Sequence, residues 1–146
     1  MDAETRDLFE SSLLDLAKAR THEGPLTDPS GQAHAKNPFC GDEVTVDVRL
    51  DAATRAITAL GYEAKACSLC VASAELLSGW VADGAGTVEE LDGLLAQIKA
   101  TLGADAAAPE GFEALASVAP FRARHRCVTL PLEAACEAGA SASKDE

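Results

Sequence analysis

The sequence predicts a domain that combines an antiparallel sheet with several helices. Residues 44–66 alternate apolar and polar side chains and are interrupted by turn residues, which is typical of short strands joined in a meander. From residue 68 onward the apolar spacing changes to the helical period. A chain of 146 residues is long enough to bury its own core, so we expect one domain.

The N-terminal third predicts one helix and a long connection. Residues 4–20 carry leucines and one phenylalanine close to helical spacing, which indicates an amphipathic helix packed on the body of the domain. Residues 21–36 contain two prolines and two glycines and predict an irregular arm. Because the arm is longer than most loops, we expect it to be functional or mobile.

The central third predicts three strands. Val44–Leu50 is apolar at every second position, residues 51–54 make a turn, and Arg55–Leu60 alternates again. Residues 61–66 then form a third strand that leads to Cys67. Ser68 is a suitable N-cap for the helix that follows, so Cys67 lies at a strand-to-helix junction.

The remaining residues predict helices separated by glycine-rich or proline-containing breaks. A capping box at residues 87–90 begins a second helix, which runs to about Thr101. The other expected features are a loop at 103–110, a short helix at 112–118 ended by Pro120, a basic segment at 122–130 and a last helix through Cys136. We expect the domain to span residues 1–138, with helix and arm at 1–36, and residues 139–146 to form a disordered tail.

The charge and hydropathy patterns exclude several classes of partner. A net charge of −12 argues against nucleic acid and against an anionic membrane surface, since both need a basic footprint. No stretch approaches the roughly 20 apolar residues that span a bilayer. The acidic N-terminus lacks the apolar core of a signal peptide, so we expect a cytoplasmic location.

Five cysteines in a reducing compartment favour ligands, nucleophiles or small buried side chains over disulfides. Cys40 and Asp42 stand two positions apart on the turn NPFCGD, which places a thiolate beside a carboxylate before a strand. Cys67 lies at a helix start, where the helix dipole favours thiolate. Cys127 follows a run of basic residues that reverses the overall sign of charge. Such boundary positions allow side chains from distant segments to converge.

The other two cysteines have simpler interpretations. Cys136 sits in an apolar helical stretch and is expected to be part of the core. Cys67 and Cys70 form a CxxC motif, which one hypothesis reads as a redox pair. The strand meander before the motif is not the βαβ context of a thioredoxin, so Cys70 is expected instead to face neighbouring helix residues or to be a reserve thiol. With a single CxxC, a zinc ribbon built from two such pairs is excluded.

Taken in order, three cysteine segments resemble those of the U-type iron–sulfur cluster scaffold family, the IscU/SufU/NifU N-terminal-domain group. The first segment is NPFCGD at 37–42, the second is CSLCVASA at 67–74, and the third is RHRCVTL at 124–130. The helix and the segment THEGPL at 21–26 are similar to the N-terminal arm of that family. The resemblance covers about residues 7–138.

The resemblance implies an α+β fold, SufE/NifU-like, with a three-stranded antiparallel sheet and helices on one face. It places Cys40, Asp42, Cys67 and Cys127 on the family's ligand positions for zinc or a [2Fe–2S] cluster. Thiolates suit both, and a single oxygen ligand makes such a site labile, as a scaffold needs. Implied partners are a cysteine desulfurase and apo iron–sulfur acceptor proteins.

Departures from the family pattern bring the chain closer to the SufU branch, whose members bind zinc and accept persulfide sulfur. Arg126 stands where the IscU branch has a histidine, and PFRAR at 120–124 replaces its chaperone-binding segment. His125 lies one position away, so in an extended segment it would point away from the site. Ala66 replaces a glycine, and Cys70 replaces a serine.

We therefore expect a scaffold or sulfur-relay protein without turnover of its own, or a sulfurtransferase. Cys127 is the expected persulfide acceptor, with Arg124 and Arg126 lowering its pKa, and with His125 and Cys70 as further supporting residues. The alternatives are a structural zinc module for protein interaction and a thiol redox protein using Cys67 and Cys70. A zinc hydrolase is a weaker alternative, because no His-rich ligand set is present.

Overall fold

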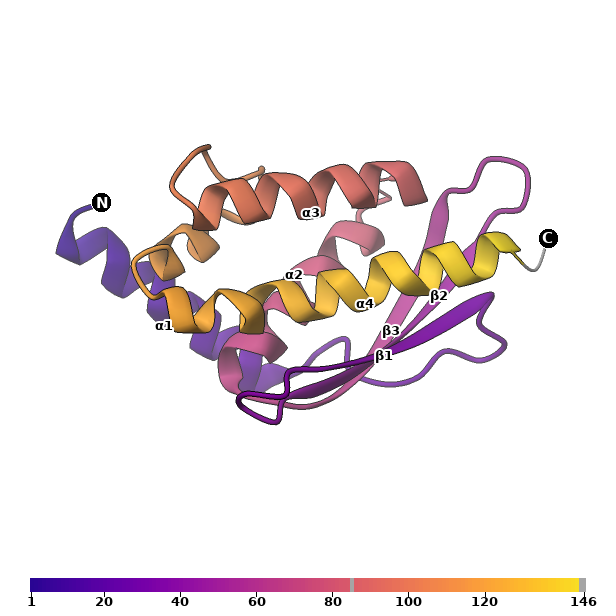
Figure 1. The fold of residues 1–146 in the computed structure, drawn as a ribbon, viewed down its shortest axis with the longest axis horizontal. Coiled ribbons are helices and arrows are strands. Elements are labelled where there is room, and N and C mark those ends of the chain that lie inside the picture. Colours follow the sequence, from indigo (N-terminus) through magenta and orange to yellow (C-terminus); the bar gives the residue numbers. More distant parts are fainter. Residues whose placement is uncertain (85, 145–146) are drawn as a thin grey trace.

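The computed structural model describes residues 1–84 and 86–144 (Figure 1). Three strands form one antiparallel sheet in the order β1-β2-β3. The strands are β1 (Gly31–Lys36), β2 (Glu43–Leu50) and β3 (Ile57–Lys65). The helices are α1 (Ala3–Ala19), α2 (Ser68–Ala82), α3 (Val88–Leu102) and α4 (His125–Lys144), with 3₁₀ turns at Glu113–Val118 and Arg122–Arg124. The fold is therefore α+β with a three-stranded antiparallel sheet, as predicted.

Helices cover one face of the sheet. α4 packs along β1 and β2, α2 packs on β3, and α3 lies on the outer side of α4 (Figure 1). The core between these layers contains Val44, Val46 and Val48 of β2, none of them more than 1% exposed. Burial of such side chains contributes about 1.5–3 kcal/mol each relative to exposure, so this layer supplies much of the driving force for folding.

Strand β1 was not expected, because its sequence GQAHAK lies in the segment predicted to be irregular. It contains no β-branched residue, and so its strand propensity is low. Tertiary packing explains the strand: β1 contacts α4 so closely that a Cβ at Gly31 would lie 2.9 Å from the Cβ of Ala142. Small residues thus allow a close sheet–helix contact that local propensity does not reveal.

The two strands expected at 55–60 and 61–66 are one continuous strand, β3. A separate third strand was expected to begin at Gly61, whereas Gly61 lies within β3, opposite Asp47. A Cβ at Gly61 would lie 2.5 Å from the carbonyl oxygen of Gly24, so the glycine permits the N-terminal arm to cross the sheet. The Leu26 N–H donates to the buried Asp47 carboxylate at 3.1 Å and fastens that crossing.

The C-terminal helix is longer than expected. Residues 139–144, expected to be a disordered tail, continue α4, and Ala142 is buried. Residues 145 and 146 of that expected tail lie outside the described residues. α4 also contains Pro131 in its interior, and a proline cannot donate the backbone hydrogen bond of a regular helix.

Candidate metal centre

The turn between β1 and β2 holds the first two candidate ligands. The Asn37 N–H donates to the Asp42 carbonyl and the Gly41 N–H donates to the Asn37 carbonyl, both at 2.8 Å. Gly41 has a φ of 81°, a left-handed conformation that glycine adopts at no steric cost. This closed turn exposes Cys40 and buries Asp42, which is 6% exposed.

Cys67 lies at the start of α2 and is joined to the same turn. It is itself the N-cap residue of the helix, one position before the expected cap at Ser68. Its backbone N–H donates to Oδ1 of Asp42 at 3.0 Å. Asp42 therefore satisfies an N–H at the helix start and fixes the β1–β2 turn against α2.

Cys127 completes the cluster from the first turn of α4, and not from a loop as predicted. The ligand atoms of Cys40, Asp42 and Cys127 all lie within 4.8 Å of one another. Cys67 is outside this tight group among the described residues, but its thiol influences the pKa of Cys127 and is influenced by Asp42. Figure 1 shows the three contributing segments at the same end of the molecule.

Burial and mutual repulsion raise the pKa values of two thiols in this cluster. For Cys67 the main cause is burial, opposed by the backbone N–H of Cys70 and reinforced by Asp42. For Cys127 burial again dominates, followed by the charges of Cys67, Asp42 and Cys40. The expectation that the helix dipole and the neighbouring arginines lower these pKa values is therefore wrong for the protein without a cation.

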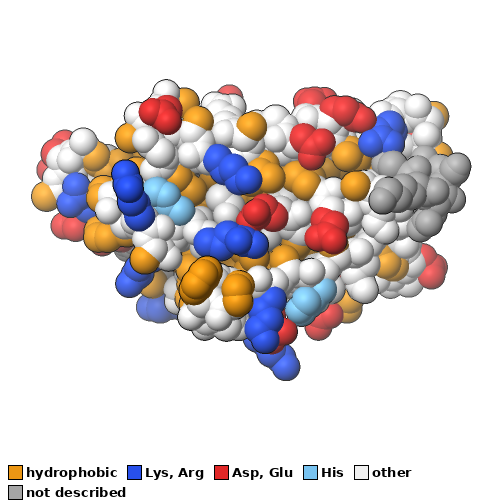
Figure 2. Space-filling view, in the orientation of Figure 1, with side chains coloured by type: hydrophobic (Ala, Val, Ile, Leu, Met, Phe, Trp, Pro, Cys, Tyr) orange, Lys and Arg blue, Asp and Glu red, His pale blue; other side chains and the backbone are white. Residues whose placement is uncertain are grey.

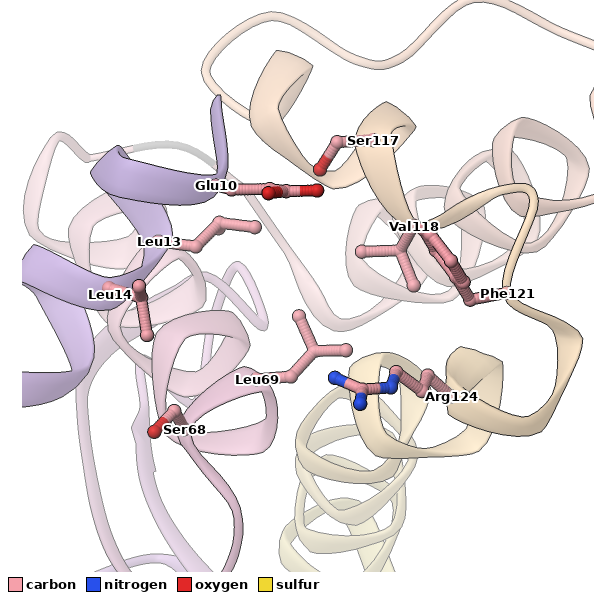
Figure 3. Close-up of a pocket in the computed structure, with 9 residues that line it drawn as sticks. All are labelled: Glu10, Leu13, Leu14, Ser68, Leu69, Ser117, Val118, Phe121 and Arg124. Carbon is pink, nitrogen blue, oxygen red and sulfur yellow. The ribbon is translucent and has the colours of Figure 1, made fainter. Parts of the chain in front are cut away.

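The arginines near Cys127 are directed elsewhere. Arg126 Nε lies 2.9 Å from Glu133 Oε2, in an ion pair along α4. Arg124 lines a cavity beside the start of α2 (Figure 3). Figure 2 shows basic side chains gathered over the half of the molecule in which α4 begins, so the local excess of positive charge is present although it does not contact the thiol.

One oxygen of Asp42 indicates what the cluster lacks. Its Oδ2 is buried and has no hydrogen-bond partner, whereas Oδ1 is occupied by the N–H of Cys67. Leaving a buried acceptor unsatisfied costs about 1–3 kcal/mol. The raised pKa values of Cys67 and Cys127 would be relieved by a bound cation, since a cation reverses the local sign. The donor set thus fits zinc or cluster iron.

The predicted supporting residues His125 and Cys70 do not belong to this group of ligand atoms, and neither does Cys136, which was expected to be part of the core. His125 Nε2 is 2.9 Å from the carbonyl oxygen of Ala119, which can only accept, so this nitrogen carries the proton and is occupied by that hydrogen bond. Cys70 is fully buried in α2, and burial raises its pKa. Cys136 is half-buried against the core, and burial together with Asp92 raises its pKa to about 12.

Sequence reasoning missed the cavity beside the cluster. It has a volume of about 330 Å³ and lies between α1, the start of α2 and the segment before α4 (Figure 3). Its apolar lining includes Leu13, Leu14, Leu69 and Phe121. Leu14 and Phe121 are about half exposed in the structure. The sequence shows only that both are large apolar residues, and it does not show that they converge, because their convergence depends on tertiary packing.

Comparisons with known proteins agree with this geometry. Residues 8–108 match the model of the family described as "NifU-like N terminal domain". This match includes Cys40, Asp42 and Cys67 and ends before Cys127. No curated protein matches the chain in sequence. No helix of the described residues is both long and apolar enough to cross a membrane.

Solved structures share the fold at low sequence identity. The N-terminal domain of a nitrogen-fixing NifU-like protein from Brucella abortus is 24% identical, with a TM-score of 0.85 over 96% of this chain and 97% of the other. A SUF-system scaffold protein from Fervidobacterium islandicum AW-1 is 20% identical, with a TM-score of 0.76 over 88% and 93%. A hypothetical protein solved at 2.3 Å is 24% identical, with a TM-score of 0.77 over 92% and 98%.

The family match covers more than half of the sequence, and the shared fold extends over nearly all of it. The family match supports a role in iron–sulfur cluster assembly, and the metal-compatible cluster of two thiols and a carboxylate lies on the elements that carry the first and third motifs. The chain belongs to the NifU-like N-terminal domain family of iron–sulfur cluster scaffolds.

Proposed function

We propose that this protein holds a labile [2Fe–2S] cluster as cargo for transfer to apo-proteins, with Cys40, Asp42, Cys67 and Cys127 as its ligands. The unpartnered Oδ2 of Asp42 carries this proposal. It is a buried carboxylate oxygen beside two thiols, and so it has an electrostatic reason to receive a metal. An oxygen ligand among thiolates favours later release of the cargo.

We further propose that the sulfur arrives from a cysteine desulfurase and is accepted by Cys127. In that step the Cys127 thiolate attacks the outer sulfur of the desulfurase persulfide, and the desulfurase thiolate leaves. Cys127 is only 7% exposed, so the first turn of α4 must move for the reaction to occur. Arg122 and Arg124, both exposed on the 3₁₀ turn before α4, supply positive charge where the Cys127 thiolate meets the desulfurase persulfide and the desulfurase thiolate leaves.

Zinc is the alternative occupant of the same four residues. It would make this protein a sulfur relay in which one ligand leaves the metal to accept sulfur. A purely structural zinc module would use the same ligands but would unfold when the metal is removed. The described core is formed by the sheet and helices and includes only Cys127 of the four proposed ligands, which favours an exchangeable metal over a structural one.

The test is metal and acid-labile sulfide analysis of protein purified without oxygen, together with a visible spectrum. Iron and sulfide in equal amounts, with colour lost to an added apo-acceptor, would support the scaffold function. One zinc per chain, no sulfide and intact folding after chelation would support the relay. Unfolding on chelation would favour the structural module, and absence of both metals would refute the proposed site.

Two cysteine variants in the same helix provide a matched pair. Cys127→Ser should lose most of the bound metal, because one of the proposed thiolate ligands is replaced by a weaker hydroxyl. Cys136→Ser should retain it, since Cys136 is half-buried beside Asp92 and is not part of the cluster. Equal retention by both variants would count against Cys127 as a ligand.

A further inference from the structure

One thiol of the CxxC motif lies outside the proposed ligand set. Cys67 is exposed and occupies the N-cap position of α2, with φ −66° and ψ 162°. Cys70 is in the first turn of the same helix and is fully buried. The two thiols thus stand at opposite ends of one helical turn, one open to a small reagent and the other shielded.

The local geometry allows these two sulfurs to meet. Side chains three positions apart on a helix have Cβ atoms about 5–6 Å apart, and a disulfide needs about 3.5–4.5 Å. Cys67 has extended rather than helical backbone angles, so its Cβ is not fixed in the helical direction, and closing the disulfide requires a rotation at this residue. The Cys67 thiol interacts with the backbone N–H of Cys70, so the sulfur already lies on the side of the residue with which it is proposed to pair.

The surroundings also favour this pair. The charge of Cys67 contributes to the raised pKa of the Cys70 thiol. In return, the backbone N–H of Cys70 opposes the rise in the pKa of the Cys67 thiol, so the two residues are direct neighbours. Only two residues separate them, which keeps the loss of chain entropy on closing the ring small. Cys127 is the competing neighbour, because its thiol interacts directly with that of Cys67, but it belongs to α4 and is far more distant in the sequence than Cys70.

We propose that Cys67 and Cys70 are a reversible dithiol–disulfide site, and that closing the disulfide withdraws Cys67 from the metal centre. The disulfide itself does not depend on the proposed function; only its effect on the metal does. The result is a scaffold whose ligand set is complete in reducing conditions and lacks one thiolate in oxidising ones.

The oxidant of this step is a small disulfide of the glutathione class. The exposed Cys67 thiolate attacks one sulfur of the reagent, forms a mixed disulfide and releases one thiol. The Cys70 thiolate then attacks the Cys67 sulfur, which forms the Cys67–Cys70 bond and releases the second thiol. Two protein thiols are oxidised, one reagent disulfide is reduced to two thiols, and the two protons remain on the released thiols. A dithiol reductant reverses the sequence.

The experiment equilibrates metal-free full-length protein with glutathione buffers from reduced to oxidised, traps free thiols by alkylation and maps tryptic peptides. The sequence makes the result unambiguous, because one peptide, 66–99, contains both Cys67 and Cys70, whereas Cys127 and Cys136 share the peptide 127–144. The expected product is peptide 66–99 with an internal disulfide and no attached glutathione.

The matched variant is Cys70→Ser, which should accumulate glutathione on Cys67 at the same buffer composition. Cys70→Ala gives the same readout if the serine is not tolerated at this buried position. Cys136→Ser should behave like the unmodified protein. A link between peptides 66–99 and 127–144 in the unmodified protein, glutathione on Cys67 despite Cys70, or free thiols at every buffer composition would each overturn the proposal.

A second measurement tests the consequence for the metal. Zinc affinity should fall by about tenfold or more on oxidation, since even weakening a ligand's outer contacts costs about 10–100-fold. Full reduction should restore it. If the disulfide forms but zinc affinity is unchanged, the withdrawal of Cys67 is wrong. If neither the reduced nor the oxidised protein binds zinc or cluster, the proposed function fails while the disulfide site stands.

Discussion

Replacing Asp42 with asparagine should have opposite effects on the metal-free and the metal-bound protein. The asparagine side chain would keep an oxygen to accept the N–H of Cys67, and its NH₂ group would replace the unpartnered carboxylate oxygen near the sulfurs of Cys40 and Cys127, which are weak acceptors. Relief of that oxygen is worth about 1–3 kcal/mol, and weakening of the charged hydrogen bond costs about 1 kcal/mol. The free energy of unfolding of the metal-free variant should therefore be unchanged or higher, as measured by urea denaturation with chelator present.

Metal binding by the same variant should weaken, because a neutral amide replaces the anionic ligand. We expect the zinc affinity to fall by about 10–100-fold, which corresponds to about 1.4–2.8 kcal/mol. Competition with a chromophoric chelator measures this. Unchanged or higher stability together with weaker zinc binding would identify Asp42 as a metal ligand, whereas lower stability with unchanged zinc binding would identify it as a structural residue.

Asp47→Asn is the matched control. Asp47 is as buried as Asp42, but both its oxygens are occupied, by the N–H of Leu26 at 3.1 Å and by Nε2 of Gln32 at 2.7 Å. An amide NH₂ at this position would face a donor, so the metal-free variant should lose about 1–3 kcal/mol of stability. If Asp42→Asn destabilises the metal-free protein as much as this control and leaves zinc affinity unchanged, the assignment of Asp42 to the metal is refuted.

Two further predictions concern the framework that holds the site. Gly31→Ala should lower the free energy of unfolding by about 1–3 kcal/mol, since the added methyl group would overlap the carbonyl oxygen of Ala138 in α4. Gly93→Ala is the control: the added methyl group would meet no neighbouring atom, so the free energy of unfolding should rise by about 0.5–1 kcal/mol. A thermal melt that ranks the two variants the other way would contradict this account of the packing. Tyr62 is the single tyrosine, and burial with its 2.7 Å hydrogen bond to Glu75 raises its pKa above the ordinary value of 10.0. Only the unfolded chain should release this proton near pH 10, so stability should fall as pH rises above that value, and tyrosinate absorbance should appear together with unfolding rather than before it.

Sequence patterns could predict those parts of the molecule in which local chemistry decides the structure. The helical period from residue 68 onward, the capping box at 87–90 and the turn at 37–42 each depend on neighbours in the chain, and each is present. The convergence of Cys40 and Cys127 was predicted because both stand at element boundaries and match the motifs of one family.

Long-range packing determines what the sequence could not predict. β1 has little strand propensity and exists because small residues allow α4 to approach it. Gly61 was expected to begin a separate strand, yet it lies within β3, where the absence of a side chain lets the arm pass over it. The direction of the Cys127 pKa shift also depends on burial and on Asp42, and neither is visible from the arginines beside Cys127 in the sequence.

Pro131 in the interior of α4 has a consequence for the order in which ligands can leave the metal centre. In a regular helix the N–H of residue 131 would donate to the carbonyl of Cys127, four positions earlier, and proline has no such N–H. The turn that carries Cys127 is therefore joined to the remainder of α4 by one backbone hydrogen bond fewer than an ordinary helical turn. Cys67, by contrast, is anchored through its own N–H to Asp42. The helix is thus less firmly held beneath Cys127 than an ordinary helical turn, so under the proposed function Cys127 is the ligand expected to leave first when the cargo is exchanged.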